Sequence, residues 1–357
     1  MQTKVTKKSD FSNHNFYIGL DVHKKSWYVT ILTDGLELKT FTQPPSALVL
    51  ADYLHTNYPG GKFFSAYEAG FCGYATHRQL LNFGIHNIVV NPADIPRMNK
   101  ELVYQTDKSD SRSIARELRN KQLQSIFIFN PQDEEFRSLF RHRLTIAKDI
   151  RKACNRIKGF LFYRSITLPP EFDNSYWSNR FLFWLENIPL EYQSARIILD
   201  QMVENYRYFH NRKLSVEAEL RKRAKEKDAV LFKLLNSIPG IGPITAIGLM
   251  AEIGDINRFP HIKQFASYVG LIPRIAQSGE KESIGAITYR HNSYLRPLIV
   301  EAAWQAVRAD PLMLEYYKKT CAPANSKKAI IKVARKLLSK IMHVMKYRIE
   351  YKKNMND

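Results

Sequence analysis

The stretch that decides the fold is residues 17–35, which read YIGLDVHKKSWYVTILTDG. Two apolar runs, Phe16–Asp21 and Trp27–Thr33, make up most of it, and the dipeptide Asp34-Gly35, a strong signal for a tight hairpin, ends it; the first run begins one residue before the stretch. A third strand-like run, Leu36–Phe41, follows directly. Together these runs predict a three-stranded meander with a single acid embedded in its first strand.

Strand-like and helix-like runs alternate after the meander. A helix-like stretch follows Pro44-Pro45 and reaches about Asn57, and three further runs follow it: Phe63–Glu68, Phe71–Phe83 and Asn87–Val90. Alternation of this kind predicts parallel βαβ units. A meander followed by such units is the order of an α/β ribonuclease H-like domain, expected here over residues 14–130, although other mixed α/β domains share it.

The middle of the chain has a different texture. Long, charged, helix-favouring sequence runs from Asp133 to about Ser165 and again from about Glu191 to Ser237, with an aromatic-rich insertion between the two stretches. This pattern predicts an antiparallel helical arm over residues 131–235, with a loop and a short helix in the insertion. The arm is either a dimerisation element or part of an ordinary helical bundle.

The third predicted domain, residues 236–350, is expected to be mostly helical. It begins with IPGIGPITAIGLMAEIGD, in which Gly240 and Gly242 fit the tight turn of a helix-hairpin-helix. The backbone N–H groups of such a turn can bind a phosphate at the start of the second helix. A purely structural hairpin is the alternative.

Charge is the strongest global signal in these 357 residues. The 54 Lys and Arg exceed the 34 Asp and Glu, which leaves a net charge of +20 and a pI near 9.7. The segment from Arg137 to Gly159 has eight basic residues and one acid, and the segment from Lys318 to Lys353 has twelve and one. Clustering of this kind indicates a polyanionic partner such as nucleic acid, rather than a generically basic surface.

The three cysteines, Cys72, Cys154 and Cys321, lie far apart and form no CxxC pair. A disulfide framework or a zinc knuckle is therefore not expected, and a reducing cytosol is the natural compartment. The N-terminus lacks an apolar core of signal-peptide length, and no run of about 18 apolar residues occurs. We expect neither secretion nor a membrane span.

Four acids form a candidate metal site. Asp21 lies inside a strand, where a lone carboxylate costs several kcal/mol unless it is paired or bound to metal. Glu68 ends a strand expected beside the first, and Asp107 and Asp110 are spaced i, i+3 near the start of a helix. Such an all-oxygen site suits Mg²⁺ or Mn²⁺ and phosphoryl chemistry. His23, without a second histidine at ligand spacing, is expected to be a strand-surface residue.

Three of these acids also have a simpler interpretation. Asp107 or Asp110 could cap a helix N-terminus, and Glu68 could be a solvated strand end. The joint occurrence of all four acids in this order favours the metal site.

A serine in the third domain is a second candidate for chemistry. Ser278 precedes Gly279 in a predicted polar loop, near Lys281, Arg290 and Arg296. A serine among cations could attack a phosphodiester while the cations stabilise the developing charge. A simple turn is the alternative.

The motifs GLDVHKKS, AYEAG, TDKSD, the PGIG block and GLIPRIAQSGEK…IGAIT…YLR together resemble the insertion-sequence one-ten family of bacterial DEDD transposases, which includes the eleven-eleven type. The resemblance covers almost the whole chain. It implies a RuvC-like N-terminal domain, a helical coiled-coil arm and a C-terminal transposase domain.

By position, the resemblance places the family's acidic tetrad on Asp21, Glu68, Asp107 and Asp110, and its catalytic serine on Ser278. It implies a recombinase whose serine links transiently to DNA while the tetrad holds Mg²⁺ or Mn²⁺ at the scissile phosphate. It also implies dimers that pair into tetramers with shared active sites, a noncoding guide RNA that pairs with donor and target DNA, and a cytoplasmic, nucleoid-associated location.

Three positions depart from the family pattern. Glu280 stands where a second glycine is common, and Tyr289 and His291 replace a lysine and a glycine before YLR. These changes concern the loop geometry and local DNA contacts. Two other functions remain open from the sequence: a RuvC-like, Mg²⁺-dependent, structure-specific DNA endonuclease without a covalent intermediate, and a nonenzymatic nucleic-acid scaffold.

Overall fold

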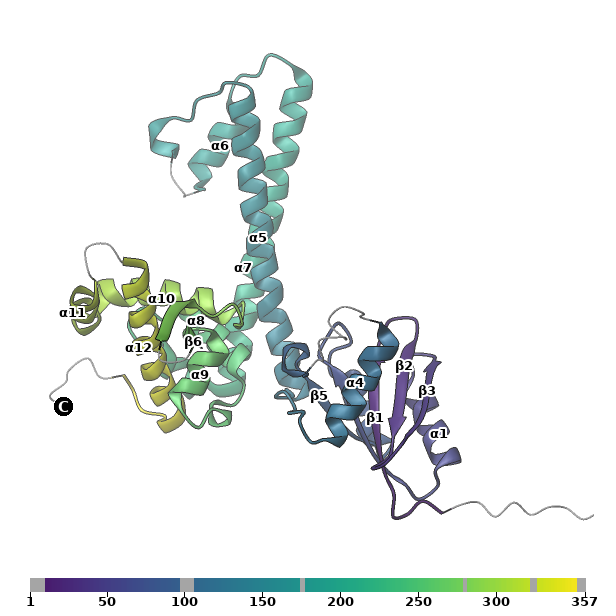
Figure 1. The fold of residues 1–357 in the computed structure, drawn as a ribbon. Helices are drawn as coiled ribbons and strands as arrows, with labels where there is room; N and C mark the ends of the chain where they lie inside the picture. The colour runs from purple at the N-terminus through teal and green to yellow at the C-terminus, as the bar shows by residue number, and fades with distance from the viewer. Residues whose placement is uncertain (1–9, 97–105, 174–176, 279–280, 322–325, 352–357) are drawn as a thin grey trace, which may run out of the picture. The chain divides into compact units, whose positions relative to one another are not determined.

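The computed structural model describes residues 10–96, 106–173, 177–278, 281–321 and 326–351 (Figure 1). The chain divides into two compact units between Ile128 and Phe129. The predicted boundary at residues 130–131 lies two residues from this division. Among the described residues, no helix is both long and apolar enough to cross a bilayer.

The first unit is built on a five-stranded mixed sheet in the order β3-β2-β1-β4-β5. The first three strands form the predicted antiparallel meander, and β4 and β5 join β1 in parallel. This order is consistent with a ribonuclease H-like fold. The strands are β1 Asn15–Val22, β2 Trp27–Leu32, β3 Glu37–Gln43, β4 Lys62–Glu68 and β5 His86–Val90.

Helices cover both faces of this sheet (Figure 1). One face buries Ile18 and Leu20 of β1 against α1 and α2, with Leu50 and Leu54 among the contacts from α1. The other face buries Ile114 of α4 against β4 and β5. Side chains alternate between faces along a strand, so Gly19 and Asp21 lie on the α4 face. The helices are α1 Ala47–Asn57, α2 Ala75–Asn82 and α4 Asp107–Arg119, with a 3₁₀ turn at Pro92–Asp94.

The helix predicted over Phe71–Phe83 is shorter than expected. It begins at Ala75 because Gly73 takes a positive φ of 56°, which belongs to a turn and not to a right-handed helix. The other predicted helix boundaries in this unit agree with the structure to within a few residues.

The second unit begins with the arm. Helices α5 Pro131–Tyr163 and α7 Gln193–Asn236 run antiparallel and pack along one another (Figure 1). The aromatic insertion between them folds as predicted, into a loop with a 3₁₀ turn at Pro170–Phe172 and the short helix α6 Asn179–Asn187. Phe181 and Leu185 of α6 are fully buried in a core at the tip of the arm.

The rest of the second unit is mostly helical, as predicted, with one β-hairpin. Its core includes Phe140 of α5 and Leu220 of α7 together with Leu249 and Leu337, so the base of the arm shares a core with the C-terminal region. The boundary at residues 235–236 therefore remains a prediction. The elements are α8 Pro243–Ile253, α9 Ile262–Val269, β6 Pro273–Ser278, β7 Lys281–Ile287, α10 Leu295–Ala309, α11 Pro311–Thr320 and α12 Ser326–Tyr347, with a 3₁₀ turn at Ile256–Arg258.

Candidate active site

Asp21 is placed by β1 and by the helix that packs on it. Gly19, two residues earlier on the same face, has no side chain, and a Cβ there would lie 1.9 Å from the Ser111 carbonyl oxygen and 2.5 Å from the Ala115 nitrogen. Helix α4 therefore lies directly on the strand. Thr30 of β2 helps to fix the position of α4 on the sheet, because the Thr30 hydroxyl lies 2.9 Å from the Ser111 hydroxyl. Close packing brings the N-terminus of α4 to Asp21.

The N-terminus of α4 is capped without the use of its acids. The Thr106 hydroxyl accepts from the Ser109 N–H at 3.2 Å, and the Ser109 hydroxyl accepts from the Thr106 N–H at 3.0 Å. This reciprocal capping box supplies the polar partners that a helix start requires. Asp107 and Asp110 lie in the first turn and do not cap the helix, so helix capping does not explain these two acids.

Asp21 and Asp107 meet at a histidine. The Nε2 atom of His23 lies 3.0 Å from Asp21 Oδ2 and 3.5 Å from Asp107 Oδ2. Among the described residues, these three side chains form a group whose potential ligand atoms all lie within 4.8 Å of one another. Their side chains are 22%, 46% and 50% exposed for Asp21, His23 and Asp107, so the group opens to solvent. A cation and a phosphate can reach it.

The pKa of Asp21 is raised above its ordinary value. Burial is the largest cause, and the neighbouring carboxylates of Asp107 and Asp110 raise it further, against the lowering effect of the His23 hydrogen bond. A half-buried carboxylate among like charges is destabilised in its ionised form. A bound divalent cation would relieve this destabilisation, and the donor set of carboxylate oxygens and an imidazole fits such a cation.

Glu68 and Asp110 lie near this group but outside its 4.8 Å set. Glu68 ends β4, one residue beyond the pairing of Leu20 with Tyr67, at the same end of the sheet as Asp21 and by alternation on the same face. Asp110 lies one helical turn after Asp107 and is close enough to raise the pKa of Asp21. Their roles as metal ligands remain predictions.

His23 is the residue that the sequence interpretation underestimated. It was expected to be a strand-surface residue, and it is indeed half-exposed, but its ring contacts two of the predicted ligands. The available signal was the spacing Asp-x-His, because residues i and i+2 of an extended segment share a face.

Ser278 ends a strand rather than lying in a loop. It is the last residue of β6 and pairs in register with Lys281, the first residue of β7. The predicted loop is therefore reduced to the hairpin turn, where Gly279 and Glu280 lie outside the described residues. The hairpin places the backbone of Ser278 at the tip of a two-stranded ribbon.

Of the two arginines predicted near the serine, Arg296 has partners inside the protein. It is half-buried, donates to the carbonyl of Thr288 after β7, and would clash with any side chain at Gly270. Burial lowers the pKa of this guanidinium. Arg290 is exposed between the hairpin and α10. Contact of either residue with nucleic acid remains a prediction.

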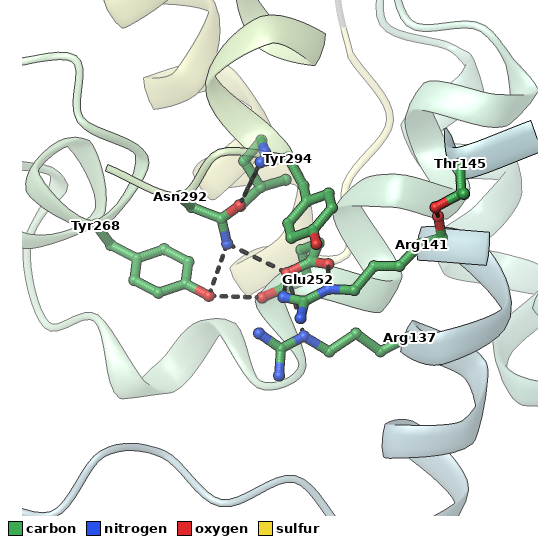
Figure 2. A network of polar contacts seen from close by, with 8 residues as sticks. Arg137, Arg141, Thr145, Glu252, Tyr268, Asn292 and Tyr294 are labelled. Carbon is green, nitrogen blue, oxygen red and sulfur yellow. Dashed lines mark hydrogen bonds and ion pairs between the residues drawn. The ribbon is translucent and has the colours of Figure 1, made fainter. Parts of the chain in front are cut away.

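A buried polar network holds the segment that follows the hairpin (Figure 2). Glu252 near the end of α8 is fully buried, and its carboxylate accepts from Arg141 at 2.6 and 2.9 Å and from Arg137 at 3.1 Å. Asn292 donates to the same carboxylate at 3.2 Å, and Tyr268 donates to the Glu252 carbonyl at 3.0 Å. Glu252 thus joins α5, α8, α9 and the start of α10.

Burial alone would raise the pKa of Glu252, but its two arginines and Asn292 more than offset burial and hold that pKa below the usual value. The Arg141 guanidinium also lies 4.1 Å from the centre of the Tyr294 ring. Asn292 completes the arrangement, because its Oδ1 accepts from the N–H groups of Tyr294 and Leu295 and so caps α10. Arg137 and Arg141 lie in the basic segment that the sequence predicts for phosphate contact, but both pair with Glu252 inside the protein.

The predicted glycine turn joins α7 to α8. Gly240 has a φ of 89°, and a Cβ there would lie 2.4 Å from the Ala302 carbonyl oxygen of α10, so packing alone requires glycine. Gly242 caps α8 and has open space around it. The turn lines a concavity of about 510 Å³ together with Gln305 and Arg308. Phosphate binding at this turn remains a prediction.

Comparison with known proteins matches two family models. Residues 18–163 match the DEDD model of IS110-type proteins, described as transposase, and residues 232–318 match the model of the IS116/IS110/IS902 transposase family. The first range contains most of β1, including Asp21, and all of β4 and α4, and the second contains the glycine turn and the β6–β7 hairpin.

Individual relatives agree with the family models. The Sinorhizobium fredii protein y4qE is 30% identical over 241 residues, which are 68% of this chain and 58% of y4qE. The transposase for insertion sequence element IS1533 of Leptospira borgpetersenii is 24% identical over 299 residues, 81% of this chain and 84% of the relative. The transposase for insertion sequence element IS1111A of Coxiella burnetii is 26% identical over 247 residues, 66% of this chain and 64% of the relative. The aligned part thus spans less than two thirds of two of these three relatives.

Proposed function

Since the chain belongs to the IS110/IS116/IS902 family of transposases, we propose that it is the transposase of a bacterial insertion sequence, which cuts DNA strands and rejoins them. The observation that carries this proposal is the convergence of Asp21, Asp107 and His23 at the end of the sheet. Their open position suits a substrate as large as a DNA strand.

The metal site of the proposed reaction comprises Asp21, Glu68, Asp107 and Asp110. Mg²⁺ or Mn²⁺ bound there would stabilise negative charge on the attacking and leaving oxygens of a phosphodiester. The chain's own contribution is rigidity. The strand register fixes Asp21 and Glu68, and the capping box at Thr106 fixes the two acids of α4.

Ser278 is the proposed nucleophile. Its hydroxyl oxygen forms a bond to the phosphorus, the bond from phosphorus to one deoxyribose oxygen breaks, and the serine proton ends on the departing oxygen. A hydroxyl of another DNA strand then attacks the phosphoserine, which rejoins DNA and frees the serine. Lys281, opposite Ser278 in the hairpin register, and Arg290 supply positive charge for the phosphate in this proposal.

DNA and a noncoding guide RNA are the proposed partners. Arg137 and Arg141 pair with Glu252, and Arg143 pairs with Glu217 of α7 at 2.6 Å, so these three cations have internal partners. Helix α5 still presents four exposed cations, and α12 presents three. Such helical rows of cations suit a phosphate backbone. The exposed residues are Lys148, Arg151, Lys152 and Arg156 on α5 and Lys327, Lys328 and Lys332 on α12.

Further contacts and assembly complete the proposal. Gly240 and Gly242 present the backbone of a helix-hairpin-helix to a phosphate. Arg296 holds the segment that follows β7 through the Thr288 carbonyl. Two copies associate through the α5–α7 arm, and dimers pair into tetramers. The protein acts in the cytoplasm, on the nucleoid when it is bound to DNA.

The decisive test of the serine step is a trapped intermediate. Wild-type protein, Ser278→Ala and Ser267→Ala, a matched exposed serine on α9, are incubated with labelled element-end and target DNA. We expect a denaturation-resistant protein–DNA adduct and strand exchange with wild type and Ser267→Ala, and neither with Ser278→Ala. Wild-type exchange by Ser278→Ala would overturn the serine mechanism.

The second candidate function is a RuvC-like, Mg²⁺-dependent DNA endonuclease that uses water and forms no adduct. The acids of the first unit alone would suffice for it, since metal-dependent hydrolysis of a phosphodiester by water requires no serine. Cleavage of branched DNA by Ser278→Ala at the wild-type rate, with no adduct in either protein, would support this alternative.

The proposed guide RNA has its own test, in which the protein is purified from its host and the bound RNA is sequenced. Recovery of RNA from the element's noncoding end would support RNA guidance, and its absence would contradict it.

A further inference from the structure

His23 has a fixed position beside the proposed tetrad. It follows the last residue of β1, and its backbone N–H donates to the Ser26 carbonyl at 3.1 Å, which closes the turn into β2. The side chain thus leaves the strand on the face that carries Asp21, two residues earlier. This turn fixes the backbone of His23 independently of any ligand.

The imidazole nitrogen contacts carboxylates from two different elements. Nε2 lies 3.0 Å from Asp21 Oδ2 on β1 and 3.5 Å from Asp107 Oδ2 on α4. One ring nitrogen carries a single proton, so it can make one good hydrogen bond and not two. The second carboxylate oxygen is not explained by hydrogen bonding alone.

A shared cation accounts for all three atoms. Two neighbouring ligands of an octahedral ion, each about 2.1 Å from the metal, lie about 3.0 Å apart. Nε2 lies at this spacing from Asp21 Oδ2 and 0.5 Å beyond it from Asp107 Oδ2, and the potential ligand atoms of all three residues lie within 4.8 Å of one another. We propose that His23 is a metal ligand through Nε2, beside Asp21 and Asp107, and that it gives the site a preference for Mn²⁺ over Mg²⁺.

The preference follows from ligand chemistry. Mg²⁺ is a hard cation that binds oxygen and dehydrates reluctantly, whereas first-row transition metals accept imidazole nitrogen readily. Replacement of one oxygen ligand by an imidazole therefore weakens Mg²⁺ more than Mn²⁺. This inference rests on the proposed metal site but not on strand exchange, so the two can fail separately.

The test uses the full-length chain and Mn²⁺ as the probe. Pulsed electron paramagnetic resonance detects ¹⁴N coupling when an imidazole binds Mn²⁺ directly. The variant is His23→Gln, which keeps hydrogen-bonding capacity, and the matched control is His86→Gln, an exposed histidine of the same unit whose ring stacks on Phe64. Thermal denaturation checks that all three proteins are folded.

We expect ¹⁴N coupling in wild type and His86→Gln and its loss in His23→Gln. We also expect His23→Gln to weaken Mn²⁺ binding by at least about tenfold, and Mg²⁺ binding by a smaller factor. Coupling that persists in folded His23→Gln, or that is absent from wild type with Mn²⁺ bound, would overturn the inference.

The two proposals are separated by combining this signal with strand exchange. A wild-type chain that binds Mn²⁺ through nitrogen but never exchanges strands would contradict the proposed function and leave His23 a ligand. A chain that exchanges strands with Mn²⁺ and lacks nitrogen coupling would contradict only the assignment of His23.

Discussion

Asp21 and Glu252 are acids that burial destabilises in their charged form, and they differ in how far they are buried and in their partners. Glu252 is fully buried in the second unit, and two arginines and an asparagine satisfy its carboxylate. Asp21 lies in the first unit at the end of a strand, among other carboxylates, with a single histidine beside it. Their pKa values are shifted in opposite directions, Asp21 upward and Glu252 downward.

The difference teaches how to separate a structural acid from a functional one. Burial costs free energy for either carboxylate, so burial alone does not distinguish them. The partners distinguish them. The charge of Glu252 is stabilised by two arginines and an asparagine inside the protein, whereas His23 does not fully stabilise the charge of Asp21, and a bound cation would. An uncompensated acid that is open to solvent is a candidate for ligand binding.

The largest expected effect concerns Asp21. We expect Asp21→Asn to reduce strand exchange by about a thousandfold or more, because metal stabilisation of a transferred phosphoryl group contributes several kcal/mol. We expect the melting temperature to stay the same or rise, since the variant removes a desolvated charge. Strand-exchange assays and thermal denaturation measure the two effects.

The matched control for Asp21 is Asp34→Asn, an exposed acid in the turn between β2 and β3, which we expect to retain exchange. A marked loss of stability in Asp21→Asn would contradict the contrast, because it would make Asp21 a structural acid like Glu252.

The second prediction concerns Glu252, for which we expect the main effect on stability. We expect Glu252→Gln to lower the free energy of unfolding by about 3–5 kcal/mol, because it removes a fully buried charge and leaves two partly buried guanidinium groups without their anion. Urea denaturation of the full chain measures the loss. The control is Glu219→Gln, which removes an exposed pair with Arg223 at 2.7 Å on α7 and should cost about 0.5 kcal/mol or less. Equal losses in the two variants would show that the network of Figure 2 is not a stabilising element.

The third prediction tests how tightly α4 is held over Asp21. A methyl group at Gly19 would overlap the backbone of Ser111, so Gly19→Ala must push the helix away from the strand. We expect a loss of about 1–3 kcal/mol in the free energy of unfolding, together with weaker Mn²⁺ binding, since Asp107 moves with the helix. Gly35→Ala is the control, because nothing lies within 4 Å of a Cβ there. Unchanged Mn²⁺ affinity in a destabilised Gly19→Ala would contradict the link between packing and the site.

These two acids also indicate what the sequence can and cannot predict. The sequence predicts Asp21 as a ligand because an acid inside an apolar strand is a local anomaly, and it predicts the succession of strands and helices along the chain from equally local patterns. Glu252 carries no local signal of that kind. Its partners, Arg137 and Arg141, lie 115 and 111 residues away along the chain, so only the folded structure brings them together.

The errors in the sequence interpretation have the same origin. Arg137 and Arg141 were assigned to a phosphate-binding cluster because their net charge is visible in the sequence and their internal partner is not. His23 is at the surface, as the sequence predicts, but its contact with Asp107 comes from an element 84 residues later and has no local signal. Ser278 was placed in a loop, because a Gln-Ser-Gly stretch reads as a turn when the pairing of β6 with β7 is unknown.

The smallest expected effect is a pH dependence of the difference in free energy of unfolding between wild type and Glu252→Gln. The pKa of Glu252 is lower in the folded chain than in the unfolded chain, so folding favours its ionised form. Its contribution to stability is complete above the unfolded pKa, about 4.3, and is lost as the pH falls through the lowered folded value. Glu252→Gln lacks this contribution at every pH.

We therefore expect the difference in free energy of unfolding between wild type and Glu252→Gln to be constant above about pH 6 and to narrow as the pH falls below about 4. Urea denaturation of both proteins across this range measures the difference, and Glu219→Gln, whose carboxylate is exposed, should show little narrowing. A difference that widened at low pH would mean that the buried carboxylate is protonated in the folded chain, and Glu252 would then resemble Asp21.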